Sequence, residues 1–389
     1  MLASRLQGIP PTIFSEMSAL AVRTGSLNLG QGFPDVDGPP EVIAEAVAAL
    51  RSGANQYAPG IGIPALRQAI ARHQQRDYGI ELDPDTEVVV TTGATEGIAA
   101  ALLGLVNPGD EVVVLEPYYD SYVAMIQMAG GVRRPVTLRA PAFRLDPDEL
   151  RAAVNDRTRF VLLNSPHNPT GSVLTRAELT AVAEVAREHD LVVITDEVYE
   201  HLTYDVEHVP LATLPGMRER TLTLSSAGKS YSFTGWKVGW ATGPSELVGA
   251  VLAAKQWLTF TSGSPLQPAV ASALDDHPDF PRELAADLQV RRDLLCAGLR
   301  KAGLEPAVPD GTYFACTDVA HLGWADGMAF CLALPERAGV VAIPAQMFYD
   351  DANPNGQGAG RHLVRWAFCK ERAVVEEGTR RLAEADLED

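Results

Sequence analysis

The chain has 389 residues, of which 46% are hydrophobic and 21% are charged, the balance of a globular protein rather than of a disordered or fibrous one. This length is enough to bury a large core and predicts two domains, or one large domain with a smaller cap. With 50 acidic and 32 basic residues the formal net charge is −18, which argues against a protein that binds nucleic acid or an anionic membrane.

Neither a targeting segment nor a cysteine motif is recognised in the sequence. The N-terminus, "MLASRLQGIPPTIF", lacks the apolar run of a signal peptide, and no stretch approaches about 18 apolar residues. We therefore expect a soluble, cytoplasmic protein. The cysteines are widely spaced and form no C-x-x-C motif, so we expect reduced thiols, with neither a zinc site nor a disulfide framework. They are Cys296, Cys316, Cys331 and Cys369.

In chain order, the first segment is rich in Gly and Pro. Residues 1–45 are expected to form an N-terminal arm and a piece of a smaller domain. From about residue 86 to 260, short apolar runs alternate with helical patterns. Near-continuous Val/Ile/Leu runs separated by helices predict a buried, mainly parallel sheet covered by helices on both faces. The apolar runs expected to form strands lie in "EVVVTTGA", "EVVVLEP", "RFVLLNSP", "LVVITDE", "TLTLSS" and "VGWATG".

The character of the sequence changes after this region. A long charged helix over about residues 280–302 precedes two further strands, "GTYFACTD" and "HLVRWAFC", which is typical of a smaller α+β domain. The prediction is thus an α/β fold with a large domain over 46–280 and a small C-terminal domain over 281–389. No internal repeat or low-complexity tract interrupts it.

Polar clusters follow five of the expected strands: "TTGATEG", "LEPYYD", "NSPHNPTG", "TDEVYEH" and "SSAGKS". Ligands of open α/β sheets bind just beyond the carboxyl ends of the strands, so these clusters are expected to meet at one place. Together they supply a helix N-terminus, an aromatic ring, an Asn, an acid, a Tyr and a Lys. That combination suits pyridoxal phosphate.

Lys229 is the residue on which this interpretation depends. "GKS" at 228–230 resembles the end of a phosphate-binding P-loop, but Thr223 stands where that motif requires its first glycine. The alternative is that Lys229 is an ordinary surface lysine, exposed to solvent. The tight loop of serines and glycines after a strand favours instead a lysine that holds the cofactor's aldehyde.

The other candidates follow from what this cofactor needs. Asp196, at the end of an apolar run, could keep the pyridine nitrogen protonated, although a helix N-cap is its plainer role. Tyr199 and Asn168 could hydrogen-bond the ring's phenolic oxygen, and Tyr119 could stack on the ring or be a core aromatic.

The phosphate group needs amides, hydroxyls and positive charge. "GATEG" begins a helix directly after a strand, so the amides of Ala94 and Thr95 could bind the phosphate at the positive end of that helix. Ser226 and Lys237 could add a hydroxyl and a charge. "GIGIPA" at 60–65 imitates half of a dinucleotide fingerprint, but it does not follow a strand and is not interpreted as one.

These motifs, with "LNLGQGFPD", "NQYAPGIGIPALRQAI" and "SSAGKSYSFTGWKVGW", resemble the class I aminotransferases of the fold-type I pyridoxal-phosphate superfamily over nearly the whole chain. The greatest similarity is to the group of N-succinyldiaminopimelate aminotransferases and kynurenine, glutamine and methionine transaminases. The resemblance implies that Lys229, Asp196, Tyr199, Asn168 and Tyr119 have the roles given above. It also implies a phosphate site of Ala94, Thr95, Ser226 and Lys237.

Further roles are implied by the resemblance alone. Tyr57 would reach the phosphate of a second subunit, which implies a homodimer, and Arg365 would grip the substrate α-carboxylate with help from Gly32 and Asn168. Aspartate-specific relatives carry an arginine in place of Lys237, which places this chain in a different subgroup. The substrates implied are an L-amino acid and a 2-oxo acid such as 2-oxoglutarate.

The sequence leaves the identity of the amino donor open. N-succinyl-LL-diaminopimelate, in lysine biosynthesis, is the first expectation, with kynurenine, methionine or glutamine as alternatives. Phe14, Phe33, Tyr57, Tyr119 and Phe348 would suit a long or apolar substituent, whereas Arg23 or Arg134 would be needed near it to bind a distal carboxylate. A cysteine-conjugate β-lyase would use the same residues. A DNA-binding regulator built on this fold is disfavoured, because the aminotransferase pattern begins at once and the chain is acidic.

Overall fold

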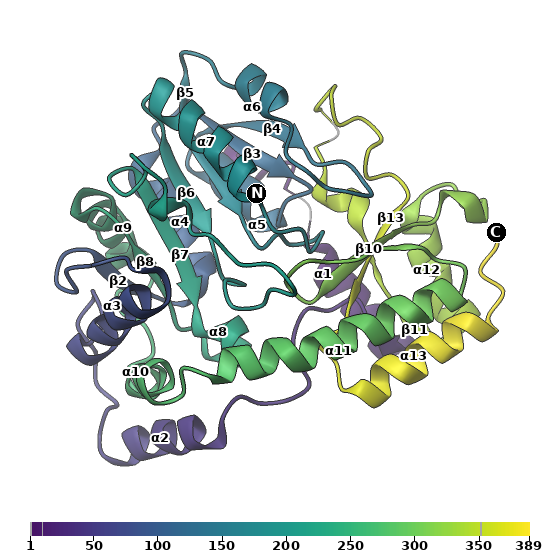
Figure 1. The fold of residues 1–389 in the computed structure, drawn as a ribbon, viewed down its shortest axis with the longest axis horizontal. Helices are drawn as coiled ribbons and strands as arrows, with labels where there is room; N and C mark the ends of the chain where they lie inside the picture. Colours follow the sequence, from purple (N-terminus) through teal and green to yellow (C-terminus); the bar gives the residue numbers. More distant parts are fainter. Residues whose placement is uncertain (1, 10, 351) are drawn as a thin grey trace.

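The computed structural model of the chain describes residues 2–9, 11–350 and 352–389. In this part of the chain a seven-stranded sheet forms the centre of the larger lobe (Figure 1), with the strand order β2-β8-β7-β6-β5-β3-β4. Its neighbours are parallel except that β8 runs antiparallel to both β2 and β7. The mainly parallel sheet is confirmed. Its strands are β2 (Val88–Thr91), β3 (Glu111–Glu116), β4 (Val132–Thr137), β5 (Thr158–Asn164), β6 (Val192–Asp196), β7 (Thr221–Ser226) and β8 (Gly239–Thr242).

Helices cover both faces of this sheet, as the continuous apolar runs predict. Alternate residues of β5 point to opposite faces: Phe160 and Leu162 pack in one apolar cluster, with α4, α5 and α9, while Val161 and Leu163 pack in another, with α7. The helices of the larger lobe are α2 (Pro40–Arg51), α3 (Pro64–Tyr78), α4 (Gly93–Leu105), α5 (Asp120–Met128), α6 (Pro147–Ala153), α7 (Arg176–Glu188), α8 (Ala227–Ser230), α9 (Ser245–Leu258) and α10 (Leu266–Asp276).

The smaller lobe is built on an antiparallel sheet with the order β12-β13-β10-β9 within the described residues, next to a short parallel pair of β1 and β11. Both strands expected from "GTYFACTD" and "HLVRWAFC" are present as β10 and β13. The strands are β1 (Leu27–Asn28), β9 (Pro306–Ala307), β10 (Phe314–Asp318), β11 (Val340–Val341), β12 (Ile343–Pro344) and β13 (Leu363–Ala367), and the helices are α1 (Ile13–Thr24), α11 (Phe280–Lys301), α12 (Gly327–Ala338) and α13 (Arg372–Glu384). Short 3-10 turns occur at Ser4–Leu6, Leu211–Thr213, Thr234–Trp236, Ala320–Leu322 and Ala345–Phe348.

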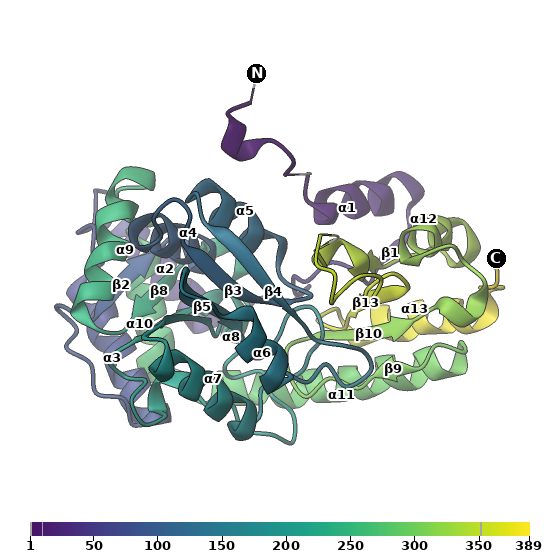
Figure 2. The same cartoon turned by 90° about the horizontal axis from the view of Figure 1, so that it is seen from above.

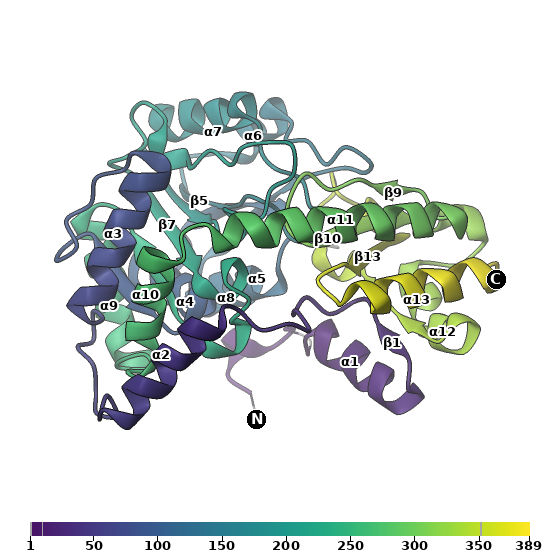
Figure 3. The ribbon, with the colours of Figure 1, turned by 60° about the horizontal axis from the view of Figure 1, so that its bottom comes forward.

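Helix α11 connects the two lobes. It begins beside α10 and runs along the small sheet, where it packs against α13 (Figure 3). Its bounds, Phe280–Lys301, agree with the helix expected at 280–302. Helix α11 thus fixes the orientation of the small sheet relative to the strand ends of the large sheet.

The N-terminal segment contributes to both lobes. Strand β1 pairs with β11 and α1 packs against α12 in the small lobe, whereas α2 packs against α10 in the large one. Figure 2 shows the first described residues leading away from α1 toward α5, where the Gln127 side chain donates to the carbonyl oxygens of Arg5 and Gln7. Because α2 spans Pro40–Arg51, it crosses the position of the expected boundary at residue 45. The division into 1–45, 46–280 and 281–389 stays a prediction.

Strand β4 was not expected from the sequence. It contains Arg133, Arg134 and Pro135, and it pairs only with β3 at the edge of the sheet. An edge strand tolerates charge and proline because one side has no neighbouring strand, so the apolar run that marks a central strand is missing. Among the described residues no helix combines the length and the apolar character needed to span a bilayer.

Helix α7 offers a test of local stability. Thr175 and Glu178 form a capping box, in which the Thr175 hydroxyl accepts from the Glu178 amide at 3.2 Å and the Glu178 carboxylate accepts from the Thr175 amide at 2.7 Å. Thr175→Ala should lower the free energy of unfolding by about 1 kcal/mol, because a helix-end amide loses its acceptor. Urea denaturation measures this. Thr180→Ala, at an exposed position inside the same helix, is the control and should cause no loss. Equal losses in both variants would contradict the assignment.

Candidate active site

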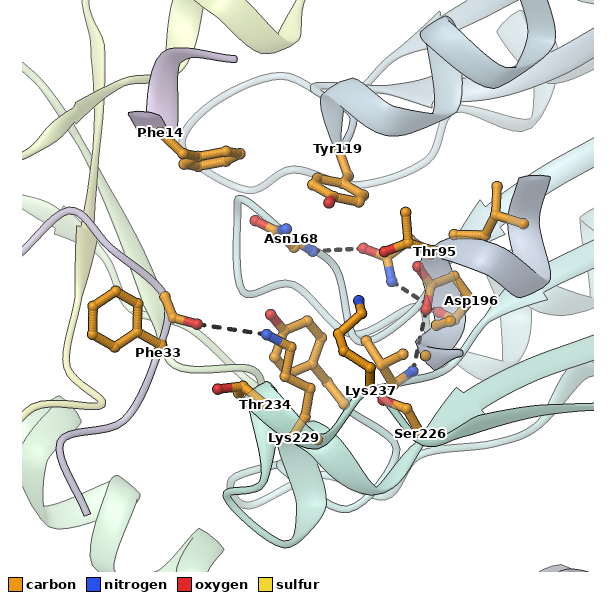
Figure 4. Close-up of a pocket in the computed structure, with 18 of the residues that line it drawn as sticks. Phe14, Phe33, Thr95, Tyr119, Asn168, Asp196, Ser226, Lys229, Thr234 and Lys237 are labelled. Carbon is orange, nitrogen blue, oxygen red and sulfur yellow. Dashed lines mark hydrogen bonds between the residues drawn. The ribbon is translucent and has the colours of Figure 1, made fainter. Parts of the chain in front are cut away.

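A cavity of about 310 Å³ lies where the carboxyl ends of the large sheet face the small lobe. Eleven of the twelve site residues expected from the sequence line it, contributed by both lobes (Figure 4). They are Gly32, Ala94, Thr95, Tyr119, Asn168, Asp196, Tyr199, Ser226, Lys229, Lys237 and Arg365. The strand-end argument therefore located the cavity correctly, while the role of each residue stays a prediction.

Asp196 lies at the end of β6, the middle strand of the sheet, and its side chain is buried. The Tyr122 hydroxyl donates to it at 2.6 Å, and the Val198 amide donates at 3.3 Å. Burial raises the pKa of Asp196 to about 6, against the opposing effect of these two hydrogen bonds. The carboxyl group is thus held in place but lacks a cation in contact with it. A protonated ring nitrogen would supply the missing positive charge.

Lys229 sits on α8, the single helical turn that follows β7. Its Nζ donates to the Tyr313 hydroxyl at 3.0 Å and reaches the Gly32 carbonyl oxygen at 3.5 Å. Tyr313 in turn donates to the same carbonyl at 2.7 Å. Burial lowers the pKa of Lys229 to about 8, so a substantial fraction of the side chain is the neutral, nucleophilic amine near neutral pH.

An anion cradle is formed where α4 begins. Gly93 has φ +72°, and a Cβ on Gly239 would lie 2.7 Å from the carbonyl carbon of Gly93 and 2.8 Å from the Ala94 nitrogen. Only glycine at 239 lets β8 approach the N-terminus of α4 so closely. Lys237 adopts a left-handed conformation with φ 55°, and its Nζ stands near Gly93. Helix amides, the Ser226 hydroxyl and an ammonium group thus converge as a phosphate would require.

Arg365 enters the cavity from β13 of the small lobe. Its side chain is buried; it donates to Asn168 Oδ1 at 3.0 Å and to the Gly30 carbonyl oxygen at 2.8 Å. The centre of its guanidinium lies 4.0 Å from the Phe314 ring centroid. Its Nε has no acceptor within the described residues. A buried, forked cation with a spare donor is suited to a carboxylate ligand.

Two of the expected residues that border the cavity are tyrosines. Tyr199 is buried, and its ring meets Tyr313 edge-on with centroids 5.3 Å apart. Tyr119 immediately precedes α5, and in Figure 4 its ring lies on the side of the cavity opposite Lys229. Burial raises the pKa of both hydroxyls, so each is a neutral hydrogen-bond donor over the physiological range.

Several other expected residues lie elsewhere. Tyr57 is 82% exposed and does not line the cavity within a single chain. Arg23 is exposed on α1, and Arg134 borders a separate cavity, where it pairs with Glu111 at 3.4 Å. Phe348 stacks behind Phe14 with centroids 5.6 Å apart instead of lining the cavity.

Sequence reasoning missed the residues that hold the central groups. Tyr122 binds Asp196 and Tyr313 binds Lys229, while Asn164 donates from its side chain to the Asp196 carbonyl at 2.8 Å. Asn164 begins the motif "NSPHNPTG", and Tyr122 follows the motif "LEPYYD" by two residues. Residues three positions apart lie on the same side of a helix, so the spacing from Tyr119 could have suggested Tyr122. Nothing local pointed to Tyr313, 84 residues beyond Lys229.

The buried carboxyl group predicts a pH-dependent stability. The folded pKa of Asp196, about 6, lies above its ordinary value of 3.8. The folded chain therefore binds more protons than the unfolded one between these values, and stability falls as pH rises from about 4 through 6. Asp196→Asn removes this cost. In the ligand-free protein it should raise the free energy of unfolding by about 1–3 kcal/mol at pH 8 and by much less at pH 4.

Thermal unfolding of wild type and Asp196→Asn at the two pH values measures this difference. Asp156→Asn, at an exposed position, is the control and should change stability equally little at both. A variant that is less stable than wild type at pH 8 would show that burial of the Asp196 carboxylate is not costly.

The comparisons with known proteins agree with this geometry. The family model for aminotransferase class I and II matches residues 24–361. The solved structure of N-succinyldiaminopimelate aminotransferase from Mycobacterium tuberculosis superposes with a TM-score of 0.95 at 52% sequence identity, covering 99% of this chain and 100% of that one. The fold-type I architecture is thereby confirmed.

Two further relatives carry other names. Methionine aminotransferase of Escherichia coli is 39% identical over 97% of both chains. Kynurenine–oxoglutarate transaminase of Dictyostelium discoideum is 38% identical, covering 94% of this chain and 92% of the relative. The chain belongs to the class I and II aminotransferase family and is an aminotransferase.

Proposed function

We propose that this aminotransferase uses pyridoxal 5′-phosphate and transfers the amino group of N-succinyl-LL-diaminopimelate to 2-oxoglutarate, in lysine biosynthesis. The observation that carries the cofactor proposal is the pairing, in one cavity, of a buried lysine of lowered pKa with a buried carboxyl group that lacks a cation. These two groups are complementary to the aldehyde and the protonated nitrogen of this cofactor.

The donor set also fits the rest of the cofactor. The glycine-lined start of α4, with Ala94, Thr95, Ser226 and Lys237, is suited to the phosphate. Asn168 and Tyr199 would donate to the phenolic oxygen, and Tyr119 would cover the ring. When bound, the cofactor supplies an electron sink that makes the Cα proton of an amino acid acidic.

The chain's own residues would then do the remaining work. Arg365, with Asn168 and the Gly32 segment, would bind the substrate α-carboxylate and so orient Cα. Lys229 would hold the cofactor's aldehyde through its Nζ, and as a neutral amine the same Nζ would accept the proton from Cα. Asp196 would keep the ring nitrogen protonated throughout. One lysine would therefore be nucleophile and base in turn.

The amino donor is proposed from the similarity to one relative. The M. tuberculosis relative named for N-succinyldiaminopimelate shares 52% of its residues with this chain over nearly the full length of both. Against it stands the lining of the cavity. Among the described residues its cations are Lys229, Lys237 and Arg365, so a distal carboxylate would have to use Gln31, backbone amides or a group from a second subunit.

The lining favours a second candidate donor. Phe14, Phe33, Tyr119 and Phe314 border the cavity, and such a surface suits the apolar side chains of methionine or kynurenine. Glutamine and the β-elimination of cysteine conjugates use the same central residues and stay as alternatives.

A homodimer is part of the proposal. Tyr57 is 82% exposed and contacts Phe260 edge-on at 5.2 Å; Trp257, Leu258 and Phe260 are themselves 84%, 48% and 53% exposed. Large apolar side chains gathered at one place on a surface are typical of a protein interface. We propose that a second copy covers them and that Tyr57 completes the phosphate site of that copy. The location in the cytoplasm stays a prediction.

The first test of the proposed function replaces Lys229. Purified wild-type protein should be yellow, and Lys229→Ala should lower turnover by several orders of magnitude, because nucleophile and base are lost together. Coupled assays of 2-oxo acid formation measure the turnover. Lys301→Ala, an exposed lysine at the end of α11, is the matched control and should keep full activity. Near-normal turnover of Lys229→Ala would refute the proposed mechanism.

The second prediction concerns the donor. Single-turnover rates with N-succinyl-LL-diaminopimelate, methionine, kynurenine and glutamine should be highest for the first. If that donor reacts more than about a hundredfold more slowly than methionine or kynurenine, a gap of about 2.7 kcal/mol in transition-state binding, the lysine-pathway assignment fails and the aminotransferase assignment survives. Pyruvate released from cysteine conjugates would identify the β-lyase.

The third prediction concerns the dimer. Tyr57→Phe should weaken retention of the cofactor by about 1–2 kcal/mol, the loss of one hydrogen bond to a charged group, and should leave the oligomeric state unchanged. Equilibrium dialysis of the cofactor and sedimentation equilibrium measure the two quantities. A monomer that retains full activity at nanomolar concentration would rule out a shared site.

A further inference from the structure

A second cluster of chemically reactive side chains lies outside the active-site cavity. His73 and Asp77 are one turn apart on α3, and His201 follows the end of β6 by five residues. The Nε2 atoms of the two histidines are 2.7 Å apart. Asp77 Oδ2 lies 3.1 Å from Nε2 of His73 and 3.9 Å from Nε2 of His201. The three candidate ligand atoms therefore lie within 3.9 Å of one another.

Hydrogen bonds alone leave these three side chains poorly paired. The two Nε2 atoms face each other at hydrogen-bond distance, so in a neutral pair one of them carries the hydrogen and the other a lone pair. If His73 Nε2 carries the hydrogen, that single N–H has two acceptors, His201 Nε2 and Asp77 Oδ2. If His201 carries it, the Asp77 carboxylate faces a lone pair of His73 at 3.1 Å. In the first tautomer two acceptors share one donor, and in the second the Asp77 carboxylate, which Arg76 also holds, stands against a lone pair of His73.

We propose that His73, Asp77 and His201 form a binding site for a divalent transition-metal ion, and that Zn²⁺ is the ion it fits best. Around tetrahedral Zn²⁺ with bonds of about 2.0 Å, ligand atoms are about 3.3 Å apart. The three observed separations lie on both sides of that value, so side-chain shifts of about half an ångström would suffice. Two imidazoles and one carboxylate are an ordinary ligand set for Zn²⁺.

The surroundings suit such a site. The buried side-chain amide of Gln74 lies 3.3 Å from His73 Nδ1, and its oxygen, turned inward, would accept from Nδ1–H when Nε2 binds a metal. Arg76 holds the Asp77 carboxylate with two hydrogen bonds, at 2.8 and 3.1 Å. His73 is buried, but Asp77 lies at the surface, which leaves water a fourth ligand position and gives the ion a way in.

The position of the site indicates a structural role. His201 belongs to the segment that begins with Asp196 and includes Tyr199, while His73 and Asp77 belong to the helix that packs on α10. A metal ion would tie α3 to the loop that carries both active-site residues, and so stabilise the folded chain. The cysteines suggested no zinc site, and the 128 residues between His73 and His201 gave no sequence signal for this one.

The test measures Zn²⁺ binding to the full-length, cofactor-loaded protein after treatment with a chelator. Equilibrium dialysis with metal analysis should find one tightly bound Zn²⁺ per chain. Zn²⁺ should also raise the unfolding temperature, because it binds only the folded state. Co²⁺ in its place should give the visible absorption bands of a four-coordinate ion.

Two variants locate the ion. His201→Gln and Asp77→Asn each remove one ligand and should weaken Zn²⁺ binding at least about tenfold. Because Asp77 is exposed, its replacement leaves the core intact, and circular dichroism checks the fold of both variants. His189→Gln, an exposed histidine at the end of α7, is the matched control and should bind Zn²⁺ as wild type does. Absence of stoichiometric Zn²⁺ binding to wild type, or equal binding by wild type and both ligand variants, would overturn the proposal.

Discussion

The burial of the Asp196 carboxyl group is the constraint on which the rest of the site depends. It stands at the end of the middle strand, held by Tyr122 and by a backbone amide, with its pKa raised to about 6 by desolvation. Burial of this carboxyl group lowers the stability of the folded chain as long as no cation is bound beside it. A ligand with a protonated ring nitrogen would offset that cost. The predicted pH dependence of stability and the proposed cofactor therefore rest on the same residue.

The remaining groups are placed around Asp196 by the topology. The parallel strands β5, β6 and β7 deliver Asn168, Tyr199 and Lys229 from the loops that follow them, and the antiparallel β8 brings Gly239 against the start of α4. The small lobe adds Arg365 from β13, and α11 fixes that lobe in position. The cavity thus brings the residues proposed to hold the cofactor, from one lobe, next to the arginine proposed to bind the substrate carboxylate, from the other.

Some of this could be predicted from the sequence, and the reasons are physical. Central strands are buried on both faces, so their apolar runs mark them, and the polar residues that end them must lie together at one edge. Strand β4 could not be found this way, because Arg133, Arg134 and Pro135 are tolerated at an edge. Tyr313 and the pair of His73 and His201 come together only through long-range packing. The proposed role of Tyr57 would depend on a second chain, which a pattern within one chain does not describe.

The most direct test of the central claim is to identify the atom that binds the cofactor. Holoenzyme would be reduced with borohydride, which fixes the cofactor to the amine that carries it, then digested and mapped by mass spectrometry. We predict the added mass on Lys229 and on no other residue, at one per chain, and its absence after prior displacement of the cofactor by a substrate amine. Labelling of Lys237 or of a surface lysine, or no labelling at all, would contradict the account.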